Sequence, residues 1–121
     1  LFVIGGRGAA LPALKTMCAD EGLENVLFLP YQPTEVLPRM YASSDVQLII
    51  QRQGLSQMSA PMKAFVIMSC GRPVIVSLDQ SGYVAALVRK AECGLVVPPE
   101  NPEKLAEAIL QAKDNREQLS V

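Results

Sequence analysis

The polar residues best suited to bind a ligand lie in the segment 51–63, between an apolar run and the start of a helix. Arg52 and Lys63 supply positive charge, while the neighbouring glutamines and Ser56 supply amide and hydroxyl groups. A helix that begins at Pro61 adds first-turn N–H groups to which no helical carbonyl is paired. Cations, polar side chains and free N–H groups together suit a sugar linked to a diphosphate. A solvated surface loop without a ligand is the alternative.

Gly6 and Gly8 belong to a glycine cluster that follows the apolar run Leu1–Ile4. The cluster invites comparison with the dinucleotide fingerprint G-x-G-x-x-G. Counted from Gly6, however, Leu11 stands where the third small residue is needed, and the next strand ends at Pro30 without an acid to hold a ribose. The sequence therefore favours a tight strand-to-helix turn over dinucleotide binding.

Composition excludes several classes of protein. The 121-residue chain is 50% hydrophobic and 19% charged with a net charge of −1, which disfavours disorder and nucleic-acid binding. It contains no histidine, so histidine catalysis and histidine metal ligation are excluded. No apolar run approaches the roughly 20 residues of a membrane span. An odd number of cysteines in apolar contexts indicates reduced thiols and a cytoplasmic location. Asp45 and Asp79 lie far apart without clustered acids, so no metal site is expected.

Apolar patterns predict strands and helices in alternation along the whole chain. Strands are expected at Leu1–Ile4, Val26–Leu29, Val46–Ile50, Val74–Val76 and Gly94–Val97. Helices are expected at Ala9–Glu21, from Thr34 to Ser44, from Pro61 to a left-handed Gly71, at Ser81–Ala91 and from Asn101 onward. This alternation predicts an α/β domain with a doubly wound parallel sheet of about five strands. Ligands bind outside the carboxyl ends of such strands, which selects the loops that begin at Gly5, Pro30, Gln51 and Leu78.

Two aromatic positions and one strand carry further expectations. The β-branched run Val74–Val76 suits a strand that is covered on both faces, and Phe65 is expected in the core against it. Tyr31 and Tyr83 follow strands and could stack on a base, although packing anchors are the commoner role.

Five tracts follow one another in order: LFVIGGRG, VLFLPYQP, LPRMYASSDVQLII, MSCGRPVIVS and ECGLVVPPENPEKLAEAI. Together they resemble the carboxyl-terminal domain of a GT-B glycosyltransferase, in the retaining family that transfers sugars from nucleotide donors. PMK before the helix resembles the P-S-K of the colanic-acid and exopolysaccharide type, with Met62 in place of the serine.

The resemblance implies that residues 1–121 are a single nucleotide-sugar-binding domain, a fragment of a two-domain enzyme. That enzyme would transfer a hexose from a nucleoside diphosphate sugar during synthesis of a bacterial surface polysaccharide. The amino-terminal acceptor domain, the one route to peripheral membrane association, would be missing, as would the family's first strand. The donor is a substrate, so no cofactor is expected, and no catalytic residue is assigned. The predicted donor site comprises Gly6, Gly8, Tyr31, Gln32, Arg52, Gly54, Leu55, Ser56, Lys63 and Gly82.

The chain departs from the family pattern at Met58 and Val66. Many members carry two glutamates at the matching positions, and the second grips the ribose. A nucleotide-binding module without transferase activity fits this departure and stays open as an alternative. A flavodoxin-like or response-regulator-like regulatory module fits the alternation of strands and helices, and a purely structural domain that binds no nucleotide is the third alternative. Without the family's first strand, we expect the sheet to close in the order 2-1-3-4-5. Otherwise a strand from a second copy would fill the gap in a strand-exchanged homodimer.

Overall fold

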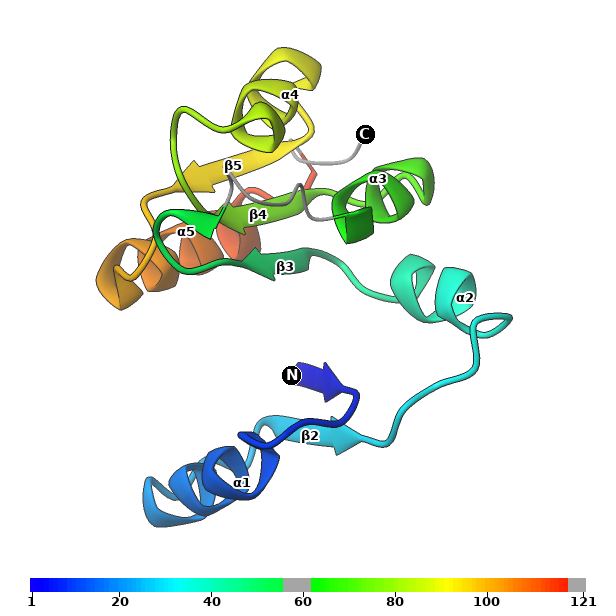
Figure 1. Cartoon of the computed structure of the whole chain (residues 1–121), viewed down its shortest axis with the longest axis vertical. Helices are drawn as coiled ribbons and strands as arrows, with labels where there is room; N and C mark the ends of the chain where they lie inside the picture. Colours follow the sequence, from blue (N-terminus) through cyan, green and yellow to red (C-terminus); the bar gives the residue numbers. More distant parts are fainter. Residues whose placement is uncertain (56–61, 118–121) are drawn as a thin grey trace. The chain divides into compact units, whose positions relative to one another are not determined.

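The computed structural model describes residues 1–55 and 62–117, in which strands and helices alternate (Figure 1). The elements are β1 (Phe2–Gly5), α1 (Leu11–Asp20), β2 (Val26–Leu29), α2 (Leu37–Ala42), β3 (Gln47–Ile50), α3 (Met62–Ser69), β4 (Val74–Ser77), α4 (Tyr83–Ala91), β5 (Gly94–Val97) and α5 (Pro102–Asp114). The expected α/β class is confirmed. The chain divides into two compact units, Leu1–Leu37 and Pro38–Val121.

The first unit is a strand–helix–strand motif. β1 and β2 pair in parallel, with Gly5 opposite Leu29, so both strands end at the same edge. Their connection runs through α1, which ends at a left-handed turn where Gly22 has φ of +64°. Glycine adopts this conformation without the steric cost that other residues meet.

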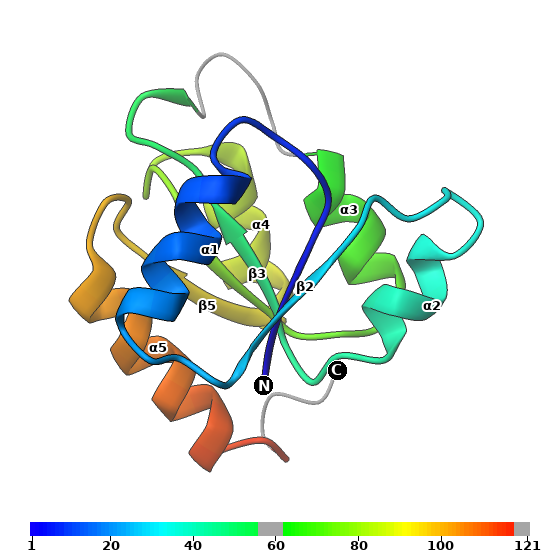
Figure 2. The same ribbon diagram turned by 90° about the horizontal axis from the view of Figure 1, so that it is seen from below.

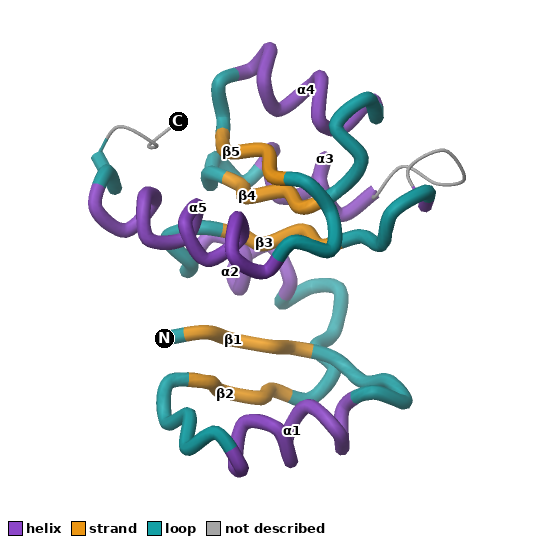
Figure 3. Tube along the Cα trace, turned by 90° about the vertical axis from the view of Figure 1, so that its left-hand side faces the viewer, coloured by secondary structure: helices purple, strands orange, loops and turns teal. Residues whose placement is uncertain are grey.

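The second unit is a three-stranded parallel sheet in the order β3-β4-β5. Every residue of β4 is buried, which confirms the strand predicted to be covered on both faces. Figures 2 and 3 show α3 and α5 on opposite faces of this sheet. On the α5 face, a core cluster joins Ile75 and Val97 to Ala108 and Ala112. α3 packs against β3 and β4, and α4 packs against β5.

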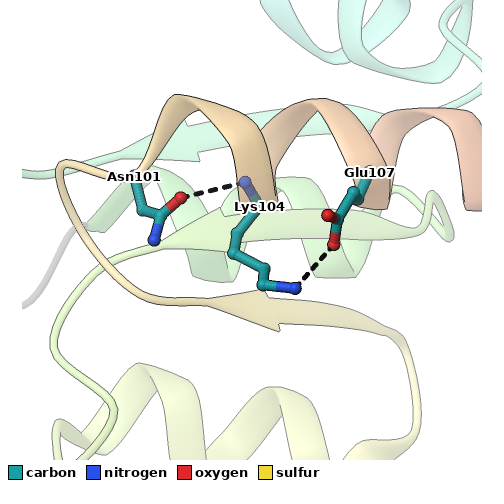
Figure 4. A network of polar contacts seen from close by, with 3 residues as sticks. All are labelled: Asn101, Lys104 and Glu107. Carbon is teal, nitrogen blue, oxygen red and sulfur yellow. Dashed lines mark hydrogen bonds and ion pairs between the residues drawn. The ribbon is translucent and has the colours of Figure 1, made fainter.

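Helix α5 begins at the cap that the sequence predicts. The side chain of Asn101 accepts a hydrogen bond of 3.0 Å from the backbone N–H of Lys104 (Figure 4). This bond satisfies one of the N–H groups that a helix start leaves free. The Lys104 ammonium lies 2.8 Å from a Glu107 carboxylate oxygen, and this hydrogen bond and charge raise the pKa of Lys104. Glu107 is thus an exposed charge paired within its own helix.

The expected place of Phe65 in the core is wrong. Its ring is half-buried and lies 6.4 Å from the ring of Tyr83, measured between centroids. The fully buried residues of α3 are Ala64 and Ile67. Helical spacing of the apolar residues identified the buried side of α3 but not its centre, because five consecutive apolar residues from Ala64 leave several orientations open. Packing against the sheet selects one of them.

The expected single sheet in the order 2-1-3-4-5 is also wrong. Among the described residues, β1 is hydrogen-bonded to β2, whereas β3 is hydrogen-bonded to β4. Apolar patterns along the chain predict strands but not which of them are hydrogen-bonded, because parallel strands pair only through long crossover connections that must pack on the sheet.

The cysteines are free thiols, as the sequence predicts. Cys93 is buried, with its sulfur 3.5 Å from the sulfur of Met68, and burial raises the pKa of this thiol. Cys18 and Cys70 are half-buried. Among the helices that the structure describes, none is long and apolar enough to cross a membrane.

Candidate functional site

The first group of predicted donor residues lies where β1 and β2 end together. The backbone N–H of Gly6 donates a hydrogen bond of 3.1 Å to the carbonyl of Leu29, so the glycine turn is tied to the end of β2. Gly6 has φ of +130°, a conformation that a side chain would strain. A Cβ on Gly8 would meet no atom within 4 Å, so the turn leaves open space beside its backbone.

The loop after β2 contacts this turn through an aromatic ring. The guanidinium carbon of Arg7 lies 5.1 Å from the centre of the Tyr31 ring, within the range of a cation–π interaction. The Gln32 side chain folds back, and its Nε2 donates a hydrogen bond of 2.9 Å to the carbonyl of Pro30. The Nε2 group of Gln32 is therefore engaged within its own loop.

The second group lies where β3 and β4 end, in the other unit. The backbone N–H of Gly54 donates a hydrogen bond of 2.9 Å to Oδ2 of Asp79, which joins the loop after β3 to the loop after β4. Gly54 has φ of +83°, and Leu55 donates its N–H to the carbonyl of Arg52 in the same turn. Arg52, Gly54 and Leu55 are thus held in a turn at this edge.

The loop after β4 is held from both ends. Gly82 precedes α4 as its N-cap residue, and its N–H donates a hydrogen bond of 3.0 Å to the carbonyl of Asp79. No side chain of the cap residue covers the first turn of α4, because the cap is a glycine. Arg89, further along α4, donates hydrogen bonds to the backbone carbonyl and the side-chain oxygen of Gln80. These hydrogen bonds fix the conformation of the loop after β4.

Gln51 places an unpaired acceptor at the same edge. Its backbone N–H donates to the carbonyl of Ser77, which continues the pairing of β3 with β4. Its side-chain Oε1 is buried and has no hydrogen-bond partner within the part of the chain that the structure describes. A buried acceptor without a donor is unfavourable, so a hydroxyl or N–H group of a ligand would stabilise it.

Lys63 lies in a helix and not in either of these loops. It is the second residue of α3, and its ammonium lies 5.8 Å from the centre of the Tyr41 ring of α2. Tyr41 is buried, so its ring offers the ammonium a fixed face. Ser56 and Met58, and the helix start expected at Pro61, lie outside the described residues.

The described residues of the predicted donor site therefore fall into two groups at strand ends, apart from Lys63, which lies in α3. Gly6, Gly8, Tyr31 and Gln32 follow β1 and β2, whereas Arg52, Gly54, Leu55 and Gly82 follow β3 and β4. From the sequence, Asp79 was weighed only as a metal ligand, and its contact with Gly54 was not expected. Its position two residues after a buried strand, at the carboxyl edge of the sheet, is the signal that could have marked it. No cluster of three metal-ligating side chains occurs among residues 1–55 and 62–117.

Comparison with known proteins supports one family. The model of the glycosyl transferases group 1 family matches residues 1–115. WcaI from Escherichia coli (strain K12), which is named for glycosyl transfer in colanic acid biosynthesis, is 27% identical over 113 residues, or 93% of this chain and 28% of WcaI. The chain thus spans less than a third of that relative.

Two solved structures share the fold. Sucrose-phosphate synthase from Thermosynechococcus elongatus matches 97% of this chain and 29% of its own, with a TM-score of 0.74 and 26% identity. HepE from Anabaena, crystallised with UDP, matches 97% of this chain and 32% of its own, with a TM-score of 0.74 and 20% identity. These likenesses confirm the expected Rossmann-like half of a GT-B fold. Since the family model matches nearly the full length, this chain belongs to the glycosyl transferases group 1 family.

Proposed function

We propose that this chain binds the nucleoside diphosphate sugar in an enzyme that transfers a hexose during synthesis of a bacterial surface polysaccharide. Membership of a glycosyl transferase family and the likeness to WcaI support this reaction. The observation that carries the proposal is the edge where β3 and β4 end. There Asp79 accepts a hydrogen bond from Gly54, in the loop that also contains the cation Arg52 and follows Gln51 with its unpaired acceptor.

Each group would receive a different part of the donor. Arg52, Lys63 and loop N–H groups would meet the diphosphate and stabilise the charge that develops on it as it leaves. The buried Oε1 of Gln51 would accept a hydrogen bond from a hydroxyl of the donor. The backbone after β2, at Tyr31 and Gln32, would meet the base. The donor is a substrate in this scheme, and the proposal assigns no cofactor or metal ion.

The rest of the enzyme would supply the acceptor. We propose that residues 1–121 act as one nucleotide-sugar-binding domain beside an acceptor domain, because the chain spans 28% of WcaI. The acceptor domain would provide any contact with a membrane surface. Free cysteines favour the cytoplasm as the compartment.

Nucleotide binding tests the proposal directly. Uridine, guanosine and adenosine diphosphates and their sugar conjugates are titrated into the full-length protein by calorimetry. We expect one base to bind more tightly than the others, and its sugar conjugate to bind at the same site in competition. A protein that binds none of the three diphosphates would contradict a donor-binding role.

A nucleotide-binding module without transferase activity is the second candidate. The observation in its favour is Val66, an apolar side chain of α3 that is 45% exposed, at the position where many family members carry an acid for the ribose. Release of diphosphate from the sugar donor, measured with the full-length protein and a crude glycolipid acceptor fraction, separates the two candidates. Binding without release, at donor saturation, would favour the module.

Lys63→Ala tests the role of the lysine at the start of α3. A cation is unfavourable at a helix start unless an anion arrives there. Loss of a charge-assisted contact should weaken diphosphate binding about tenfold to a hundredfold. Loss of the contact with Tyr41 should also lower the free energy of unfolding by about 0.5–1 kcal/mol. Calorimetric titration and urea unfolding measure the two effects.

Lys90→Ala is the matched control for Lys63→Ala. Lys90 is exposed in the last turn of α4. Its removal changes the net charge by the same amount as Lys63→Ala but leaves the start of α3 unaltered. We expect this variant to keep wild-type affinity. If Lys63→Ala also kept wild-type affinity but lost stability, Lys63 would be a structural partner of Tyr41 and would not bind the donor.

A further inference from the structure

We propose that Asp79 is a positioning residue that holds the loop 51–55 in the conformation that receives the donor diphosphate. The inference rests on the proposed function, since it concerns the same edge of the sheet. It assigns Asp79 a role through Gly54 and its neighbours, not a contact with the reacting atoms.

The contact itself is long-range in sequence. Oδ2 of Asp79 accepts the hydrogen bond of 2.9 Å from the N–H of Gly54, although the two residues are 25 positions apart. A carboxylate that accepts from a backbone N–H forms a stronger bond than a neutral acceptor does. The bond thus fixes one point of an exposed loop against the residue that directly follows Leu78, which is fully buried.

The loop needs such a fixed point because of its glycine. Gly54 has φ of +83°, and a Cβ there would meet no atom within 4 Å. Glycine adopts this conformation without strain, but many other backbone conformations are also accessible to it. Restricting it to one of them is therefore entropically unfavourable. Within the turn, the N–H of Leu55 donates to the carbonyl of Arg52, and an acceptor outside the loop adds a second restraint. Asp79 is the acceptor that the structure provides.

The Asp79 end of the bond is better fixed than the Gly54 end. The carbonyl of Asp79 accepts the N–H of Gly82 at 3.0 Å, and the neighbouring Gln80 accepts two hydrogen bonds from Arg89 of α4. The loop after β4 is therefore tied to a helix, whereas the loop after β3 is exposed from Arg52 to Leu55. The hydrogen bond therefore lets the better-fixed Asp79 restrain Gly54, and not the reverse.

A competing role for Asp79 would have the opposite effect on diphosphate affinity. A carboxylate next to a diphosphate repels it, and this carboxylate also occupies an N–H that a phosphate could use. If that effect dominated, any neutral residue at position 79 would tighten diphosphate binding. If positioning dominates, only a residue that cannot accept the Gly54 N–H should weaken binding.

The experiment compares Asp79→Ala and Asp79→Asn in the full-length protein. Affinity for uridine, guanosine and adenosine diphosphates is measured by calorimetry, and amide hydrogen exchange is measured over residues 51–55. Asp79→Ala should weaken binding of the preferred diphosphate about fivefold to tenfold, because the unheld loop must be ordered on binding. Its Gly54 amide should exchange faster. Asp79→Asn should restore affinity to within about twofold, because Oδ1 of asparagine still accepts the N–H.

Asp45→Ala is the control for the loss of charge. Asp45 lies just before β3, at the opposite end of that strand, and forms an exposed ion pair with Arg116. An exposed pair contributes little to stability, so this variant should fold and bind as the wild type does.

Three results would overturn the inference. Wild-type affinity in Asp79→Ala would show that the loop needs no support, and unchanged exchange at Gly54 would show that Asp79 does not hold it. Tighter binding in both Asp79 variants would show that the carboxylate competes with the ligand. Failure of the proposed function is recognised separately, as absence of binding in the wild type. In that case the donor role of Asp79 falls with it, while exchange at Gly54 still decides whether Asp79 holds the loop.

Discussion

Replacing Gly94 with alanine is expected to lower the free energy of unfolding by about 3 kcal/mol or more. Gly94 opens β5 opposite Val74 of β4, and a Cβ built on it would lie 1.9 Å from the backbone carbonyl oxygen of Val74. A backbone carbonyl in a central strand cannot move aside as a flexible side chain can. The first residue pair of β4 and β5 would have to separate, with loss of buried contact between α4 and β5.

Urea unfolding of wild type and Gly94→Ala measures this effect, with Gly8→Ala as the control. A Cβ on Gly8 would meet no atom within 4 Å, so the control should stay within about 0.5 kcal/mol of wild type. A Gly94→Ala variant as stable as Gly8→Ala would mean that the pairing of β4 with β5 is looser than described.

Ile67→Ala is expected to lower the free energy of unfolding by about 2–5 kcal/mol. Ile67 is 0% exposed in α3, which packs against β3 and β4. Removing its side-chain carbons loses burial of apolar surface and leaves a cavity between the helix and the sheet. Phe65→Ala should have a smaller effect, because Phe65 is half-buried and packs beside the ring of Tyr83.

Val66→Ala provides the control on the same helix. Val66 is the preceding residue and is 45% exposed, so its truncation should change stability by less than about 0.5 kcal/mol. Urea unfolding of the three variants under one set of conditions ranks them. If Phe65→Ala proved more destabilising than Ile67→Ala, the buried face of α3 would have to be rotated.

Sequence alone determined the features that depend on neighbours along the chain. The left-handed turn at Gly71, with φ of +66°, and the Asn101 cap of α5 were both expected from residue type and position. Each depends on hydrogen bonds or steric limits that span a few residues, so local sequence carries the information. The buried strand β4 was also expected, because an unbroken β-branched run needs cover on both faces.

Tertiary structure decided which distant residues meet. It paired β1 with β2 and β3 with β4, placed the Lys63 ammonium over Tyr41, and brought the carboxylate of Asp79 to Gly54. Periodicity assigns a residue to a face of an element, but it does not say which element lies opposite or at what register. That choice follows from packing volumes and hydrogen-bond pairing across the whole unit. Local sequence could therefore indicate the loops of the candidate site, while only the folded chain showed how Asp79 joins them.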